Sequence, residues 1–161
     1  STPARITSKY YPSVLSPDPF LNARASSMTF LISKEGMQYV QPPSISKPRG
    51  HYSPAVIHNG FVFVSGQLPM DKEGKPVGTT VEEQMLQCLR NIDDILKASG
   101  SGIPLVVKAT VFVTDIGDWP KVNTVFASYF GDLRPARVVV PVGKLIDGIL
   151  VEIDCIAGLA S

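Results

Sequence analysis

The chain has 161 residues, of which 44% are hydrophobic and 18% charged, the balance of one soluble globular domain with a sizeable core. The net charge of +1 and the scattered Lys and Arg residues favour neither a nucleic-acid nor a membrane partner, and no apolar stretch approaches the ~20 residues of a membrane span. Cys88 and Cys155 lie far apart without CxxC spacing, so we predict buried free thiols in a reducing compartment and no metal site.

Residues 1–36 differ in composition from the rest of the chain. The first 30 residues are rich in Ser and Pro, and their charged residues are Arg5, Lys9, Asp18 and Arg24. This bias resembles that of an organelle transit peptide, and the alternative is an arm outside the core. We therefore assign residues 1–36 to an N-terminal arm and 37–161 to the folded domain, with mitochondrial and cytoplasmic locations both open.

The first regular elements are predicted strands. MQYVQ (37–41) is a short strand candidate closed by two prolines. AVIHNGFVFVSG (55–66) predicts a hairpin, because two apolar runs flank Asn59-Gly60, a pair that tolerates the positive φ angles of a type I′ turn. The Gly- and Pro-rich residues 66–78 then predict a loop.

A long helix is expected next. Thr80 and Glu83 have capping-box spacing, and apolar residues recur every three to four positions as far as Leu96, with Gly100 at the end. Residues 105–114 are rich in β-branched side chains and predict a strand. In that strand, Lys108 and Thr110 would face opposite to Val107, Ala109 and Val111.

The last third of the domain predicts a helix and two strands. Asp118 is the expected N-cap of the helix, Pro120 lies in its first turn, and Gly131 ends it. RVVVPV (137–142) and ILVEIDCIAG (149–158) are the expected strands, the first bent or at an edge because Pro141 cannot donate to a ladder.

The resulting order, β-β-β-α-β-α-β-β, predicts an α+β sheet with both helices on one face. The strands are apolar enough that the other face needs cover, so we expect an oligomer.

Arg137 stands directly before a run of valines in the sequence. A guanidinium stays charged, and burying it without a partner is costly. It either forms an ion pair with an acid such as Glu152 or Asp154, points to water, or clamps the carboxylate of a ligand through two parallel bonds.

Three further features are candidate sites. Strand alternation places Glu152 and Asp154 on one face, where burial in an oligomer would raise their pKa and suit proton relay. His51 is a possible acid or base, or an exposed loop histidine, and Tyr52 a ligand contact or a packed aromatic. In SGQ (65–67), Gly66 permits close backbone approach to an anion, or the segment is a plain turn; a serine hydrolase has little support.

Several motifs together resemble one family over roughly residues 37–159. They are GHYSPAV (50–56), NGFVFVSGQLP (59–69), VN (122–123), RPAR (134–137) and VEIDCIA (151–157), which occur in the order and near the spacing of the Rid or YjgF family of reactive intermediate deaminases. The resemblance implies a chorismate-mutase-like mixed sheet with two helices on one face. It also implies a homotrimer with the other sheet face inside and sites between subunits.

The implied activity is hydrolysis of 2-imino acids to 2-keto acids and ammonia, with no metal or cofactor and with no nucleic-acid or membrane partner. Arg137 would bind the substrate carboxylate, and Glu152 would orient or activate the attacking water. Tyr52 would line the pocket, Gly66 would offer backbone contacts, and Asn123 would help shape the site. The alternatives are a carboxylate-binding trimer without turnover and a pathway-specific enzyme acting on a larger imine.

The sequence also departs from the family pattern. Val138 and Val139 replace a small polar residue and a frequent cysteine, His51 replaces a proline, and KLIDG (144–148) stands where a Leu-Pro turn is common. These changes bear on the substrate more than on the fold, and they leave a bulkier or more apolar imine or enamine open.

A geometric argument bears on the pairing of Arg137 with Glu152. A tight hairpin at Asp147-Gly148 would place Glu152 opposite Gly143, and Arg137 would then lie six residues or roughly 20 Å away. Either the connection is longer, or the two residues meet across a subunit boundary.

Overall fold

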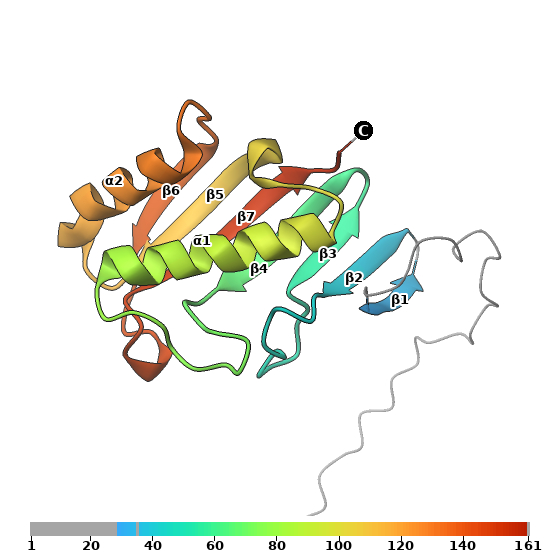
Figure 1. Cartoon of the computed structure of the whole chain (residues 1–161), viewed down its shortest axis with the longest axis horizontal. Helices are drawn as coiled ribbons and strands as arrows, with labels where there is room; N and C mark the ends of the chain where they lie inside the picture. Colours follow the sequence, from blue (N-terminus) through green and yellow to red (C-terminus); the bar gives the residue numbers. More distant parts are fainter. Residues whose placement is uncertain (1–28, 35, 161) are drawn as a thin grey trace, which may run out of the picture.

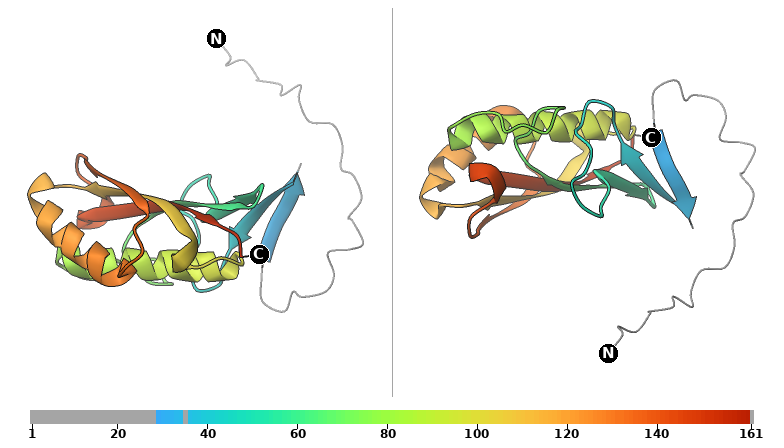
Figure 2. Two further views of the ribbon diagram at one scale, coloured as in Figure 1. Left: turned by 90° about the horizontal axis from the view of Figure 1, so that it is seen from above. Right: turned by 90° about the horizontal axis from the view of Figure 1, so that it is seen from below.

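The structure is a computed structural model that describes residues 29–34 and 36–160 (Figure 1). Seven strands form one mixed sheet in the order β1-β2-β3-β4-β7-β5-β6. The strands are β1 Thr29–Lys34, β2 Met37–Gln41, β3 Ala55–His58, β4 Phe61–Gln67, β5 Val106–Val113, β6 Ala136–Pro141 and β7 Val151–Gly158, and the helices are α1 Val81–Ala98 and α2 Trp119–Phe130. Both helices lie on the same side of the sheet, as predicted (Figure 2).

The sheet begins earlier in the chain than predicted. β1 lies within residues 1–36, yet its backbone pairs antiparallel with β2, so residues 29–34 are part of the sheet and not of an arm outside it. Residues 1–28, with the predicted transit-peptide bias, lie outside the described residues.

The predicted hairpin is confirmed. β3 and β4 pair antiparallel up to His58 and Phe61, and the two residues between them have positive φ, 48° at Asn59 and 79° at Gly60. Positive φ at both central positions is the requirement of a type I′ turn.

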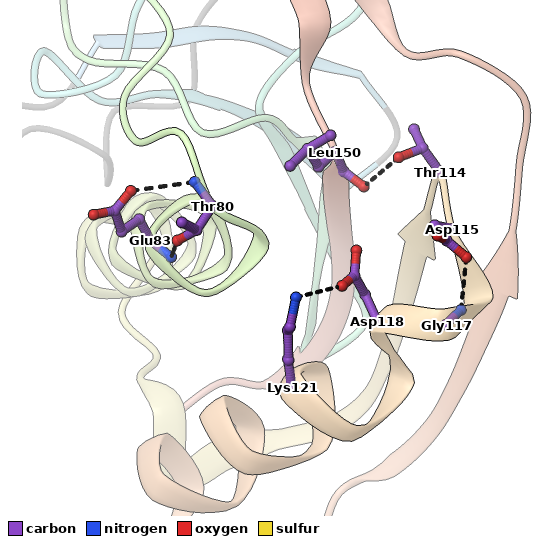
Figure 3. A network of polar contacts seen from close by, with 8 residues as sticks. All are labelled: Thr80, Glu83, Thr114, Asp115, Gly117, Asp118, Lys121 and Leu150. Atoms are coloured by element: carbon purple, nitrogen blue, oxygen red, sulfur yellow. Dashed lines mark hydrogen bonds and ion pairs between the residues drawn. The ribbon is translucent and has the colours of Figure 1, made fainter.

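Helix α1 begins and ends as predicted. The Thr80 hydroxyl accepts from the Glu83 backbone N–H, and the Glu83 carboxylate accepts from the Thr80 backbone N–H (Figure 3). Gly100 follows the helix with a φ of 75°. The apolar stripe is fully buried against the sheet, and Cys88 within it is a free thiol, as is Cys155 on β7.

The prediction that Asp118 caps α2 is wrong in its chemistry. The helix starts at Trp119, but the Asp118 carboxylate accepts from Lys121 Nζ at 2.9 Å and makes no cap (Figure 3). Asp115 instead accepts from the Gly117 backbone N–H at 2.8 Å, which caps a 3₁₀ turn over Ile116–Asp118 that leads into the helix.

Strand β5 departs from simple alternation at its start. Its pairing with β7 shifts between Val106 and Lys108, so a β-bulge turns Val107 outward and leaves it 49% exposed. Val107 therefore does not share a face with Ala109 and Val111, which are buried under the helices as predicted.

The last two strands do not form a hairpin. β5 lies between them, parallel to β6 and antiparallel to β7, so a tight turn at Asp147-Gly148 is wrong. The connection is longer and contains a 3₁₀ turn over Ile146–Gly148. Pro141 ends β6 at the edge of the sheet, which agrees with its lack of an N–H.

We call the sheet face away from the helices the open face. It carries large apolar side chains, with Phe61 and Phe63 each 43% exposed and Val138 44% exposed. Neither helix of the described chain lies on it (Figure 2). For the residues that the structure describes, the prediction that one face of this sheet lacks cover is therefore confirmed.

Candidate functional site

Arg137 points from the edge strand β6 toward helix α2. Its Nη2 donates to Asn123 Oδ1 at 3.1 Å, and its guanidinium carbon lies 4.7 Å from the centre of the Phe126 ring. The Phe126 ring is itself stacked on Phe130, with ring centres 4.3 Å apart. A neutral acceptor and an aromatic face hold the guanidinium without neutralising its charge.

No acid pairs with Arg137 among the residues that the structure describes, because the ion pairs there join other residues. The alternative of an internal pair with Glu152 or Asp154 is therefore wrong, and so is an arginine pointing freely to water, since the side chain is half-buried. The guanidinium keeps donors free for an anion.

An open hollow of about 450 Å³ lies beside the guanidinium. We call it the Arg137 pocket; its walls include Asn123, Phe126, Phe130, Arg134, Pro135 and Arg137. Two arginines, an amide and aromatic rings suit a small organic anion. The departures from the family pattern leave this pocket open, because Val138 lies on the open face and Val139 packs against the core.

Glu152 lies on β7 in the middle of the sheet, and its side chain points to the open face. Its neighbours Val151 and Ile153 are fully buried on the other face, so the predicted alternation is confirmed. A Cβ built on Gly66 would overlap the Glu152 carboxyl group, with 2.8 Å to its carbon. Gly66 is therefore the residue that lets this carboxylate lie against the β4 backbone.

The electrostatics at Glu152 are unfavourable to its charge. Burial, and then the negative charge of Asp154 on the same face, raise the pKa of the Glu152 carboxyl group above its ordinary value. The facing residue on β5 is Phe112, an apolar side chain that offers no hydrogen bond. Such a carboxylate suits proton transfer better than a solvated one does.

Tyr52 lies at the loop end of the sheet, 55% exposed. With Gly66 it lines a small cavity of about 90 Å³, to which Arg49 and Gln67 also contribute. We call Tyr52, Gly66, Glu152 and Asp154 the Glu152 cluster, since Gly66 contacts both the cavity and the carboxylate.

The neighbouring Ser65 and His51 take no part in a nucleophile arrangement. The Ser65 hydroxyl donates to the Pro54 carbonyl oxygen at 3.2 Å, and Gln67 Nε2 lies 3.3 Å from the same hydroxyl. His51 is exposed in its loop. A serine hydrolase therefore gains no support.

One chain does not bring all five predicted site residues together. Arg137 is in register with Ala109 and Glu152 with Phe112, so they lie two strands and three residues apart, a Cα separation of roughly 14 Å. Their side chains also leave opposite faces of the sheet. The structure thus gives two separate groups, Arg137 with Asn123 and Glu152 with Gly66 and Tyr52.

The contact between Phe126 and Arg137 was not predicted from the sequence. The signal was present, because Asn123 and Phe126 are three residues apart and share a helix face. Among the described residues, no three His, Cys, Asp or Glu side chains are placed to hold a metal ion. Within the same residues, neither helix is long and apolar enough to cross a membrane.

Comparisons with known proteins agree with this fold and with these motifs. A family model described as Endoribonuclease L-PSP matches residues 44–159. The chain belongs to this family, which is the YjgF or Rid family that its motifs resemble.

Its relatives include proteins with named activities. A bovine 2-iminobutanoate/2-iminopropanoate deaminase is 45% identical over 109 residues, which covers 67% of this chain and 80% of the bovine protein. The chloroplastic Reactive Intermediate Deaminase A of Arabidopsis thaliana is 38% identical, covering 88% of this chain and 73% of that protein. The crystal structure of RidA from an Antarctic Psychrobacter has a TM-score of 0.72 at 34% identity, covering 76% of this chain and 99% of that one.

Proposed function

We propose that this protein hydrolyses 2-imino acids to 2-keto acids and ammonia at a site formed between two copies of the chain. One observation carries the proposal: the candidate site residues form two groups that leave opposite faces of one sheet. Each group contains half of what imine hydrolysis needs, a carboxylate binder or a proton acceptor. The names of the bovine and Arabidopsis relatives support the same reaction.

The assembly that would join the two groups is a homotrimer with the open face inside. Phe61, Phe63 and Val138 make that face apolar, and an exposed apolar sheet face is typical of an interface. In such a ring each copy gives its Arg137 pocket to one neighbour and its Glu152 cluster to the other. Three equivalent sites result.

Arg137 would hold the substrate carboxylate. The Asn123 oxygen and the Phe126 ring fix the guanidinium plane, so its remaining N–H groups present a fork to the ligand. Arg134, on the wall of the same pocket, adds positive charge. Positioning is the main contribution, because free imines already hydrolyse in water.

Glu152 of the neighbouring copy would activate the water. As the water oxygen adds to the C=N carbon, the Glu152 carboxylate accepts one water proton and passes it to the imine nitrogen, which gives a neutral adduct with one hydroxyl and one amino group. Glu152 then accepts the hydroxyl proton and passes it to the amino nitrogen, so that the C–N bond breaks, the C=O bond forms and ammonia leaves. The sum is one imino acid and one water to one keto acid and one ammonia.

The test is Arg137→Ala with 2-iminopropanoate generated by a coupled dehydratase and trapped as its semicarbazone. We expect the enzymatic acceleration to fall by at least about 100-fold with the far-ultraviolet circular dichroism unchanged. The matched control is Arg90→Ala, an exposed arginine on α1, which should hydrolyse the imine as the wild type does. Full activity of Arg137→Ala would contradict the proposal.

The same assay separates the alternatives. A protein that leaves imine loss at the buffer rate, while a keto acid still raises its melting temperature, is a carboxylate-binding module without turnover. Faster turnover of a bulky imine than of 2-iminopropanoate identifies a pathway-specific enzyme.

A further inference from the structure

Arg49 joins three segments of the chain at the rim of the small cavity beside Tyr52. Its Nη1 donates to Asp147 Oδ2 at 2.8 Å, and its Nη2 donates to the Gly74 carbonyl oxygen at 2.7 Å. The two acceptors are 98 and 25 residues away in sequence. We call Arg49, Gly74 and Asp147 the Arg49 clasp.

Both acceptors are held by their own local structure. Asp147 has a φ of 54° inside the 3₁₀ turn over Ile146–Gly148, a conformation that Asp tolerates better than most residues. Gly74, with a φ of 77°, belongs to a turn in which its N–H donates to the Asp71 carbonyl oxygen at 3.0 Å. The clasp therefore ties the Arg49 backbone to two preformed turns.

The backbone that Arg49 fixes also sets the place of Tyr52. The Tyr52 N–H donates to the Gly50 carbonyl oxygen at 3.1 Å, which closes a tight turn. The Tyr52 ring lies against Gly50, because a Cβ built there would be 3.3 Å from Tyr52 Cε1. A shift at Arg49 would therefore move the ring.

The clasp forms part of the wall of the cavity as well. Arg49, Gly74 and Ile146 line the same space of about 90 Å³ as Tyr52 and Gly66. Release of the clasp would separate these walls and enlarge the cavity.

We infer that Arg49 is a positioning residue that fixes Tyr52 and restricts the site to imines with small side chains. This inference rests on the proposed function. It also gives a role to the KLIDG segment that departs from the family pattern, since Asp147 supplies the carboxylate of the clasp. That role favours small imines over the bulkier imine that the departures had left open. An exposed ion pair contributes little to stability, but a fork shared between two turns restricts geometry, so the effect should be on substrate binding.

The experiment compares Arg49→Met, Asp147→Asn and the double variant in the full chain. Substrates are 2-iminopropanoate and the bulkier imine that an amino-acid oxidase forms from leucine. We expect KM for 2-iminopropanoate to rise roughly 3- to 10-fold with kcat within about twofold, and the kcat/KM ratio of bulky to small imine to rise. The double variant should resemble Arg49→Met, because both single changes break the same interaction between Arg49 and Asp147.

The matched control is Lys97→Met, which breaks the exposed pair with Asp93 on α1 and should change neither constant. Arg49→Lys should restore KM in part, since an ammonium group lacks the fork. Additive effects of Arg49→Met and Asp147→Asn, or a loss confined to kcat, would overturn the inference.

A second measurement keeps the inference apart from the proposed reaction. Fluorotyrosine incorporated at the five tyrosines gives one ¹⁹F signal for each, and the signal that is lost in Tyr52→Phe is assigned to Tyr52. That signal should shift or broaden in Arg49→Met and stay unchanged in Lys97→Met. Wild-type protein without imine hydrolysis would remove the proposed function, and an unchanged Tyr52 signal would remove the role of Arg49.

Discussion

The Arg137 pocket and the Glu152 cluster each contain a half-buried charged group, but the surroundings of the two charges differ. Arg137 has an amide oxygen at 3.1 Å and an aromatic face at 4.7 Å, and both come from one turn of α2. Glu152 has a glycine backbone, a phenylalanine and a second carboxylate near it. One charge is stabilised within the chain, whereas the other is left in an environment that opposes it.

This difference indicates that the Arg137 pocket, and not the Glu152 cluster, is ready for a ligand before the proposed assembly of chains. A guanidinium with fixed orientation and free donors needs only a ligand. A carboxylate with a raised pKa on an uncovered apolar face gains its working surroundings when a second surface covers it. We therefore expect carboxylate binding to survive in separated chains better than catalysis does.

The largest effect is expected when two inactive variants are mixed, one changed in the Arg137 pocket and the other in the Glu152 cluster. In the proposed homotrimer, Arg137→Ala and Glu152→Gln each remove one half of every site, but random mixed trimers would contain sites with both halves intact. Refolding the two together should restore about a quarter of wild-type activity. The measurement is imine hydrolysis before and after mixing.

Its control mixes Arg137→Ala with Asn123→Ala, two changes in the same half. No site in a mixed assembly then has both Arg137 and Asn123 intact, so little activity should return. Equal recovery in both mixtures, or none in either, would show that the two halves are not shared between copies.

A smaller effect is expected at Gly66, which belongs to the Glu152 cluster. Gly66→Ala places a methyl group where the Glu152 carboxyl group lies, so the carboxylate must move. We expect kcat/KM to fall about 10- to 100-fold. Gly143→Ala is the matched control, because a Cβ there meets no atom within 4 Å. Unchanged kinetics of Gly66→Ala would show that the position of Glu152 is unimportant.

The smallest effect concerns the pH dependence set by Asp154. Burial and, after it, the charge of Asp154 raise the pKa of Glu152. Only ionised Glu152 accepts a proton, so activity is lost as the pH falls through that pKa. Asp154→Asn removes the raising charge, and the acid limb of kcat/KM should move to lower pH. Asp94→Asn, an exposed acid on α1, should leave the profile in place. A shift to higher pH would contradict this account.

Local sequence patterns predicted the elements but not their neighbours. The Asn59-Gly60 turn and the Thr80 capping box depend on residues within a few positions, and both form as predicted. The insertion of β5 between β6 and β7 depends on packing over the whole sheet. The bulge at Val107 likewise arises from pairing with a strand about 50 residues later.

The sequence nominated residues for the candidate site but did not predict how they are arranged. Family motifs pointed to Arg137 and Glu152, but the opposite faces that they occupy follow from strand order and register. The Arg49 clasp had no signal at all, because Arg49 and Asp147 are 98 residues apart and each is ordinary in its own loop.

The central position of β7 has a consequence for how the protein is made. β7 is the last strand along the described residues, yet it lies between β4 and β5. While a ribosome has yet to release residues 151–158, the first four strands and the β5–β6 pair cannot join into one sheet, and each presents an unpaired edge. Edges of this kind invite wrong pairing, so the nascent chain stays exposed to aggregation until residues 151–158 have left the ribosome.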